Sequence, residues 1–234
     1  ARFRPGAVRD VYVREDAWVT HADIVEAAQR ATRWVHPVTA EVSVALSRDS
    51  QGVCAVASAD AVSRELPELS VGETLVVLAQ GRDPGNVGTI IRTADAFGAV
   101  GVITVSGTVE ATSPKVVRAS AGSVFHIPVC IVPSFEEAHA LIHRRSAALL
   151  GTSGGAGSLD LSQMLAQGVS GRSRLSQSHA WVFGNEAKGL SGAEMRLCDA
   201  LVSIPMTGDA ESLNVASAAT ACLFASQTVR GMAL

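Results

Sequence analysis

Short apolar runs alternate with helical patterns along the chain beyond residue 73. The runs occur at 75–78, 101–105, 127–132, 147–151, 180–183 and 200–204. They lack the polar alternation of a strand with one wet face and are typical of parallel strands covered on both faces. Helical segments follow most of them, so the pattern predicts an α/β fold with a mostly parallel sheet. Sites in such sheets lie at the carboxyl ends of the strands.

The first part of the chain has a smaller pattern of its own. The expected elements are a strand at 8–13, a helix at 20–31, a short element at 42–46 and a strand at 51–57. Thr20 is the expected cap of that helix. Residues 67–73 are short and polar enough for a linker. We therefore predict two domains, 1–68 and 73–234, with the first incomplete at its N-terminus.

Composition and charge narrow the function classes without choosing one. The net charge is −3, from 19 Lys and Arg against 22 Asp and Glu, which by itself does not favour nucleic-acid binding. Residues 111–132 contain Lys115, Arg118 and His126 but no Asp or Glu. This basic stretch could contact phosphates, or it could be only a solvated face. The four cysteines form no metal-ligand pattern, so we expect no metal. No secretory segment and no apolar run of about 18 residues occurs, so we expect a cytoplasmic protein.

A polar loop and a helix start near the C-terminus form the first candidate site. A short apolar strand ends at Pro205, a polar loop follows, and Ser212-Leu213-Asn214 opens a long alanine-rich helix. The helix start offers free backbone N–H groups, and Ser212 and Asn214 add side-chain oxygens for a polar ligand. In the alternative interpretation Ser212 is only the N-cap, and Asn214 helps to satisfy the first turn.

Two earlier stretches favour the binding site. Residues 83–99 and residues 181–191 each follow or include an apolar strand and continue into a polar, glycine-containing turn. In this order and spacing, the three stretches resemble the motifs of the SpoU (TrmH-like) family of RNA ribose 2′-O-methyltransferases, within the SPOUT superfamily. The resemblance covers roughly residues 73 to 230.

The resemblance implies an architecture that the apolar pattern alone does not reach. It implies a C-terminal trefoil knot, a feature that is rare among proteins. It also implies S-adenosylmethionine (SAM) as the cofactor and a homodimer, whose formation the small residues of the last helix would suit. Residues 51–57 resemble a strand of the L30e-like RNA-binding domain that often precedes this catalytic domain. The alternative is an ordinary small α/β unit without a role in RNA binding.

The resemblance also implies which residues are catalytic. Asn86, Arg92 and Asn214 match family residues around the reacting ribose, Glu186 matches a glutamate that positions them, and Ser212 belongs to the same set. Arg92 is either a strongly perturbed base or a charged group that anchors a phosphate and stabilises the developing alkoxide. Deprotonating a free arginine near neutral pH costs about 7 kcal/mol unless burial or neighbouring charge lowers that cost.

Purely structural roles are open to the same residues. Arg92 could cover apolar surface with its stem, and Asn86 could be the N-cap of its own helix. Glu186 could be a first-turn acid that complements a helix dipole. Arg118 matches a further basic position near the RNA, and with Lys115 it is a candidate phosphate contact. A surface helix arginine is the alternative.

The resemblance places the cofactor among three loops that follow strands. The candidate residues are Thr152, Ser153, Gly154, Gly184, Asn185, Ile204, Met206, Ser212 and Leu213. Glycines would let backbone amides approach the adenosine closely, and Ile204, Met206 and Leu213 could enclose the adenine. Core packing is the alternative, foremost for Ile204. Ala187 stands where the family commonly has glycine, which puts only the local loop geometry in question.

Together these observations predict a SAM-dependent enzyme that methylates a ribose 2′-hydroxyl of structured RNA, with 23S ribosomal RNA as the expected target. An enzyme that confers antibiotic resistance by modifying the ribosome fits the same residues. The alternatives are a tRNA ribose methyltransferase, a base methyltransferase of related fold and a non-catalytic RNA-binding protein. The last is disfavoured because the chain retains Asn86, Arg92, Glu186, Ser212 and Asn214.

Overall fold

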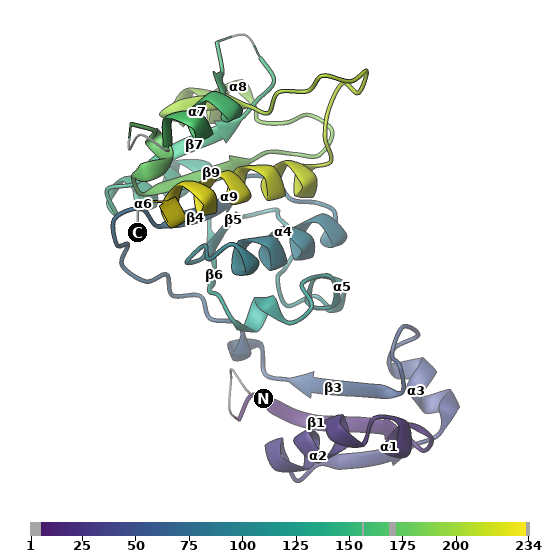
Figure 1. Cartoon of the computed structure of the whole chain (residues 1–234). Coiled ribbons are helices and arrows are strands. Elements are labelled where there is room, and N and C mark those ends of the chain that lie inside the picture. Colours follow the sequence, from purple (N-terminus) through teal and green to yellow (C-terminus); the bar gives the residue numbers. More distant parts are fainter. Residues whose placement is uncertain (1–5, 156, 169–171, 233–234) are drawn as a thin grey trace. The chain divides into compact units, whose positions relative to one another are not determined.

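The computed structural model describes residues 6–155, 157–168 and 172–232 and shows two compact units, Ala1–Ala61 and Val62–Leu234 (Figure 1). The division falls earlier than the boundary predicted at 68–73. The expected linker belongs to the second unit because Leu66 and Leu69 pack against its core. Ser70 and Gly72 are also held there, since the Ser178 hydroxyl donates to the Ser70 carbonyl and accepts from the Gly72 amide.

The first unit is a three-stranded sheet in the order β2-β1-β3 with short helices. Its elements are β1 (Val8–Arg14), α1 (Ala17–Thr20), α2 (Ala22–Ala31), β2 (Val35–Val38), α3 (Ala40–Leu46), β3 (Val53–Ala57) and η1 (Ala59–Ala61). β2 is parallel to β1, and β3 is antiparallel to it. Val11 and Val13 of β1 pack with Ala17, Val25 and Ala28 of α1 and α2, so these helices cover one face of the sheet.

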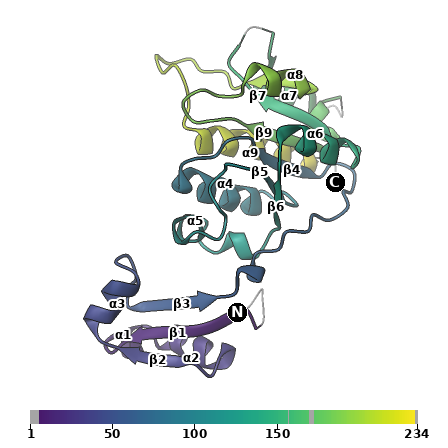
Figure 2. The same ribbon diagram turned by 180° about the vertical axis from the view of Figure 1, so that it is seen from behind.

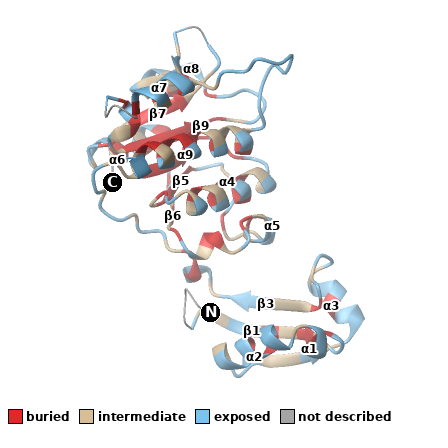
Figure 3. Cartoon of the chain, viewed as in Figure 1, coloured by how far each residue is buried: buried red, intermediate tan, exposed pale blue. Residues whose placement is uncertain are grey.

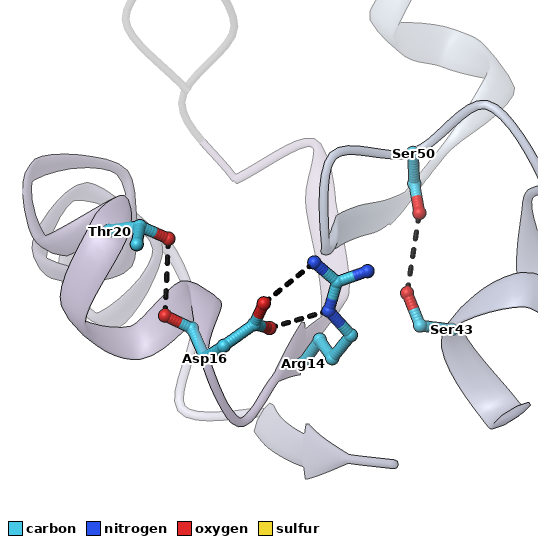
Figure 4. A network of polar contacts seen from close by, with 5 residues as sticks. All are labelled: Arg14, Asp16, Thr20, Ser43 and Ser50. Carbon is cyan, nitrogen blue, oxygen red and sulfur yellow. Dashed lines mark hydrogen bonds and ion pairs between the residues drawn. The ribbon is translucent and has the colours of Figure 1, made fainter. Parts of the chain in front are cut away.

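Thr20 does not cap the expected helix at 20–31. It ends α1 instead, and its hydroxyl donates to the Asp16 carbonyl at 3.1 Å (Figure 4). Asp16 also binds Arg14 of β1, with 2.8 Å between the Arg14 Nη2 and the Asp16 Oδ2. The local Arg14 and Asp16 pair therefore fixes the turn from β1 into α1, and α2 starts at Ala22, after His21.

The second unit contains a seven-stranded sheet in the order β6-β5-β4-β9-β7-β10-β8 with only parallel pairs, which confirms the predicted fold class. The strands are β4 (Thr74–Leu78), β5 (Val102–Val105), β6 (Val129–Val132), β7 (Ala148–Thr152), β8 (Leu159–Asp160), β9 (His179–Phe183) and β10 (Ala200–Ser203). All five residues of β4 and all five of β9 are buried (Figure 3). Burial on both faces explains why these runs show no polar alternation.

Helices cover both faces of this sheet (Figures 1 and 2). They are α4 (Pro84–Ala96), α5 (Pro114–Ala119), α6 (Phe135–His143), α7 (Leu161–Gly168), α8 (Gly192–Leu197) and α9 (Val215–Met232), with short 3₁₀ turns η2 (Ser123–Phe125) and η3 (Arg174–Ser176). One core joins α4, α5, α7 and α9 to one face, and a second core joins α6 and α8 to the other. None of the helices in the described residues is long and apolar enough for a membrane span.

A buried polar group attaches α9 to β9. The Ser226 hydroxyl of α9 lies 2.8 Å from the Nε2 of His179 and 2.8 Å from the indole Nε1 of Trp181, both in β9. The other imidazole nitrogen of His179 lies 2.7 Å from the Gln177 carbonyl, which can only accept. The His179 Nδ1 therefore carries the proton, and the Nε2 accepts from the Ser226 hydroxyl.

Candidate active site

Strand order brings the predicted cofactor loops to one edge of the sheet. Thr152 ends β7, Gly184 follows β9 and Ile204 follows β10, and these three strands are neighbours. Because all three are parallel, their carboxyl ends lie at the same edge. β4 is the next neighbour of β9 and leads into α4, which carries Asn86 and Arg92. The chain fold thus gathers all three motifs.

A hydrogen bond joins the first motif directly to the third. The Asn214 Nδ2 donates to the Asn86 Oδ1 at 3.0 Å, across 128 residues of sequence. The Asn214 Oδ1 accepts from the backbone amides of Ala216 and Ser217 at 2.8 and 3.4 Å. Asn214 therefore caps α9 with one end of its amide and holds Asn86 with the other.

The purely capping interpretations of Ser212 and Asn86 are wrong. Helix α9 begins at Val215, after Asn214, and Ser212 is exposed before it. Helix α4 is capped by Asp83, whose side chain accepts from the Asn86 amide at 2.7 Å. Asp83 followed by Pro84 is a helix-start signature that sequence reasoning could have used. The Asn86 side chain is left to contact Asn214.

Glu186 links the second motif to the first. Its Oε1 accepts from the backbone amides of Arg82 and Asp83 at 3.3 and 3.1 Å, immediately before α4. Glu186 lies in a turn and not in the first turn of a helix of its own. Its carboxylate instead faces the start of another helix, α4, where N–H groups and the dipole favour an anion. This contact fixes the turn after β9 against the loop after β4.

The turn after β9 is held by hydrogen bonds among its own residues. The amide of Asn185 donates to the Gly189 carbonyl at 3.0 Å, and the Gly189 amide returns a bond to the Asn185 carbonyl at 2.8 Å. The Asn185 Oδ1 accepts from the amides of Ala187 and Lys188. A Cβ on Gly184 would lie 2.3 Å from the Gly189 carbonyl carbon, so only glycine fits. Ala187 has no positive φ, so alanine is accommodated there.

The loop after β7 is connected to both neighbouring strands. The Thr152 hydroxyl donates to the Val182 carbonyl of β9 at 3.0 Å, and the Ser153 amide donates to the Val202 carbonyl of β10 at 3.0 Å. The Thr152 hydroxyl is therefore engaged within the protein. Gly154 is exposed, and a Cβ built on it would meet nothing within 4 Å.

The three apolar cofactor candidates differ in exposure. Ile204 is partly buried and packs against the core, which confirms the packing interpretation for this residue. Met206 and Leu213 are each 43% exposed in the loop between β10 and α9. These two side chains remain available to an apolar ligand face, together with Gly154 and the turn at Gly184. Two exposed apolar side chains beside glycine-containing loops fit the flat face of an adenosine-containing cofactor.

The predicted RNA-contacting residues lie on two adjacent helices. Arg92 is exposed on α4 and forms no hydrogen bond or ion pair with a described residue. Lys115 and Arg118 are exposed on α5. The helices approach closely at Gly88, where a Cβ would lie 2.5 Å from the Ala119 Cβ and 2.7 Å from the Val116 carbonyl oxygen. Close approach brings α5 and its two cations beside the helix that carries Arg92.

Sequence reasoning missed a cleft next to this centre. Its volume is about 400 Å³, and it lies beyond β4 and β5 on the α6 and α8 side of the sheet. It is lined by Ala79, Gln80, Arg82, Val105, Ser106, Gly107, Phe135, Glu136, Ser191, Ala193 and Glu194. Ser191 and Glu194 form a capping box, which their spacing could have indicated. The predicted cofactor residues do not line this cleft.

The profile of the SpoU rRNA Methylase family matches residues 73–224. The 23S rRNA (guanosine-2′-O-)-methyltransferase RlmB of Bordetella pertussis is 33% identical over 234 residues, covering 96% of this chain and 91% of that relative. A 23S rRNA (uridine(2479)-2′-O)-methyltransferase of Streptomyces viridochromogenes is 42% identical over 146 residues, covering 60% of this chain and 47% of that relative.

A solved structure agrees over nearly the whole chain. The SpoU methyltransferase AviRb from Streptomyces viridochromogenes, in complex with the cofactor AdoMet, is 30% identical with a TM-score of 0.73. The match covers 96% of this chain and 83% of that chain. Family profile, full-length relative and solved structure thus coincide with the motif order read from the sequence and with the parallel sheet. The chain belongs to the SpoU rRNA methylase family.

Proposed function

We propose that the protein transfers a methyl group from SAM to a ribose 2′-hydroxyl of 23S ribosomal RNA. The observation that carries the proposal is the Asn214 to Asn86 hydrogen bond, which unites two motifs of the family at α4, the helix that also carries the exposed Arg92. The relatives named above are 23S rRNA 2′-O-methyltransferases, which supports the RNA class. The AdoMet complex of AviRb supports the cofactor.

For methyl transfer the protein must align the ribose 2′-oxygen with the methyl group and stabilise the negative charge that develops on that oxygen. SAM supplies a methyl on a positively charged sulfur, and the ribose 2′-oxygen must approach it in line. The loops after β7, β9 and β10 hold the cofactor, and Asn86, fixed by Asn214, orients the ribose. Glu186 keeps the turn after β9 and the start of α4 in one arrangement. Asn86, Asn214 and Glu186, together with the loops after β7 and β9, are positioned by hydrogen bonds within the protein.

In this proposal Arg92 acts as a charged group. Its guanidinium is exposed and can bind the phosphate next to the target ribose in a bidentate manner. Its charge also stabilises the developing alkoxide, so the hydroxyl proton can pass to water. Lys115 and Arg118 of α5 extend the same phosphate-binding surface. The role of base is disfavoured because an arginine loses its proton near neutral pH only at a cost of about 7 kcal/mol.

Labelled methyl transfer to unmodified 23S rRNA and, separately, to tRNA tests the proposal. We expect label in 23S rRNA, a drop of about 100-fold or more for Arg92→Ala, and partial activity for Arg92→Lys, which keeps the charge. Arg174→Ala, which removes an exposed arginine from η3, is the matched control and should retain activity. Equal loss in Arg92→Lys and Arg92→Ala would contradict the electrostatic role.

The same assay separates the alternatives. Label only in tRNA would replace the rRNA target, and SAM binding without label in any RNA would favour a non-catalytic RNA-binding protein. Nucleoside mass analysis after nuclease digestion distinguishes a methylated ribose from a methylated base. The resistance role, the knot and the cytoplasmic location stay predictions.

We further propose that the protein is a homodimer that uses α4 and α9. Phe224 of α9 is 54% exposed and meets Phe97, the C-cap of α4, edge to face with ring centroids 6.0 Å apart. Small residues of α9 next to this pair suit close packing between copies. Sedimentation of the wild type and of Phe224→Glu tests the proposal, because an introduced charge should shift a dimer toward monomer.

A further inference from the structure

The cleft beside the candidate active site combines buried apolar residues with exposed polar ones. Val105 and Phe135 line it and are buried, and both pack in the core that joins α6 and α8 to the sheet. Arg82 and Glu136 also line it and are exposed. An apolar surface with a few polar groups is typical of a small-ligand site, and the volume of about 400 Å³ lies in the range of such sites.

The cleft shares the loop after β4 with the candidate active site. Arg82 lines the cleft, and its backbone amide, with that of Asp83, donates to the Glu186 carboxylate. Asp83 in turn accepts from the Asn86 amide. Neighbouring strands lie about 4.8 Å apart and only β9 separates β4 from β7, so the ends of β4 and β7 lie about 10 Å apart. A nucleotide whose ribose reaches Asn86 can therefore place its base in the cleft.

The charges around the cleft disfavour a phosphate. Helices α6 and α8 begin there, and the start of a helix commonly attracts an anion. The protein's own groups already engage both starts. The Glu194 Oε2 accepts from the Ser191 amide at 2.6 Å, and the Ser134 Oγ accepts from the Glu137 amide at 3.3 Å. The lining contains two carboxylates and one guanidinium, so an added anion would be repelled, whereas a neutral group that donates hydrogen bonds is accommodated.

The Glu136 carboxylate is a charged acceptor at the start of α6. Hydrogen bonds from its own amide and from the Ser134 hydroxyl lower its pKa, so it is ionised at neutral pH. It is exposed, and its two oxygens can accept two parallel N–H bonds. Glu194 is less available because it is buried and bound to the Ser191 amide. Glu136 is therefore the acceptor that a ligand in the cleft can reach.

Guanine is the base whose edge matches this acceptor. Its N1–H and its 2-amino group are adjacent donors, whereas uracil presents one N–H between two carbonyl oxygens, which a carboxylate repels. The 6-oxygen of guanine can accept from Arg82, whose side chain forms no hydrogen bond or ion pair with a described residue. One relative named above is a guanosine methyltransferase and the other a uridine methyltransferase, so membership of the family leaves the base open.

We propose that the cleft binds the base of the target nucleotide and that Glu136 selects guanine by accepting from its N1–H and its 2-amino group. Arg82 donates to the 6-oxygen. This inference rests on the proposed function and adds to it the identity of the methylated nucleoside. Because the Watson–Crick edge of the base is bound, the target guanosine is unpaired when it reacts.

Inosine in place of the target guanosine tests the contact with Glu136. Primer-extension stops at low nucleotide concentration first map the methylated nucleotide in 23S rRNA, and a fragment with inosine at that position is compared with its guanosine form. Inosine lacks only the 2-amino group, so we expect the wild-type kcat/KM to fall about tenfold. In Glu136→Ala the guanosine form should react about tenfold or more slowly, and the two forms should react at similar rates.

Glu137→Ala is the matched control. It removes the next exposed acid from the same first turn of α6, and Glu137 is not among the residues that line the cleft. We expect this variant to keep the wild-type ratio between the guanosine and inosine forms. The ratio compares two RNAs on one protein, so a partial loss of folded enzyme cancels.

Mapping and the rate ratio separate this inference from the proposed function. If the mapped nucleotide is not a guanosine, if the wild type reacts equally with both forms, or if Glu136→Ala keeps the wild-type ratio, Glu136 does not select the base and methyl transfer itself stands. If no RNA accepts label, the proposed function is overturned, and the inference about the base with it.

Discussion

The buried imidazole of His179 makes the stability of the second unit depend on pH. Burial lowers the pKa of His179 from its usual 6.5 to about 4, despite the Gln177 carbonyl, which raises it. The folded protein therefore keeps this imidazole neutral, whereas the unfolded chain binds a proton below its ordinary pKa. Between these two pKa values the unfolded state holds more protons, so stability falls as the pH falls through this window.

The size of the effect follows from the two pKa values. A difference between 6.5 and about 4 corresponds to about 3 kcal/mol once the pH is below both pKa values. At about pH 5 the loss relative to neutral pH is about 2 kcal/mol. Above the ordinary pKa of the imidazole the contribution of His179 is fully retained. For a protein of typical stability this is a large fraction of the free energy of unfolding.

Urea unfolding at neutral pH and at about pH 5 measures this loss. Trp18 and Trp34 belong to the first unit, so a Trp18→Phe/Trp34→Phe background leaves Trp181 as the only tryptophan and reports the second unit alone. We expect His179→Phe in this background to lose about 2 kcal/mol less than its parent on acidification. Both proteins are compared at one concentration, because association changes apparent stability.

A second variant separates titration from hydrogen bonding. Ser226→Ala removes the partner of His179 and Trp181 but keeps the buried imidazole. It should be less stable than its parent by about 1–3 kcal/mol at both pH values and should keep the acid-dependent loss. The reasoning is refuted if His179→Phe and its parent lose the same free energy on acidification.

Two further predictions concern the site. Asn214→Asp keeps an oxygen that caps α9 but cannot donate to the Asn86 Oδ1. We therefore expect a melting temperature close to that of the wild type and a methyl-transfer rate reduced about tenfold or more. A normal rate would show that this hydrogen bond has no part in the mechanism. Gly184→Ala places a Cβ 2.3–2.5 Å from the backbone of Gly189 and Leu190, so the turn must shift. Calorimetry should show weaker SAM binding, and unchanged affinity would place the cofactor elsewhere.

The sequence predicted the parallel sheet because its strands are buried on both faces and read as continuous apolar runs. It missed β2, where Pro37 and His36 interrupt a four-residue strand, and β8, which has only two residues. It assigned the cap of α4 to Asn86 as an alternative, although Asp83 before Pro84 carried the stronger signal. Short elements leave too few residues for a period to be recognised.

The site was predictable in part for a physical reason. Parallel strands end at one edge, so residues after β7, β9 and β10 could be grouped before the structure was known. The order β4-β9-β7-β10 could not be read from the sequence, and that order decides which loops touch. The bond between Asn86 and Asn214 and the contact of Glu186 with the amides before α4 therefore emerged only in three dimensions.

The hydrogen bonds of Ser226 to β9 also affect the position of the residues at the start of α9. Helix α9 is rich in alanine, and small side chains offer few distinct ridges, so apolar packing alone would tolerate a slip along its axis. The Ser226 hydroxyl can hydrogen-bond both His179 and Trp181 in only one position of the helix. These two contacts therefore fix the register of α9 along β9. Ser226 lies about 17 Å along the helix from Val215, at a rise of about 1.5 Å per residue. A hydrogen-bonded contact in the core therefore determines the position of Asn214, which lies immediately before the first residue of the same helix.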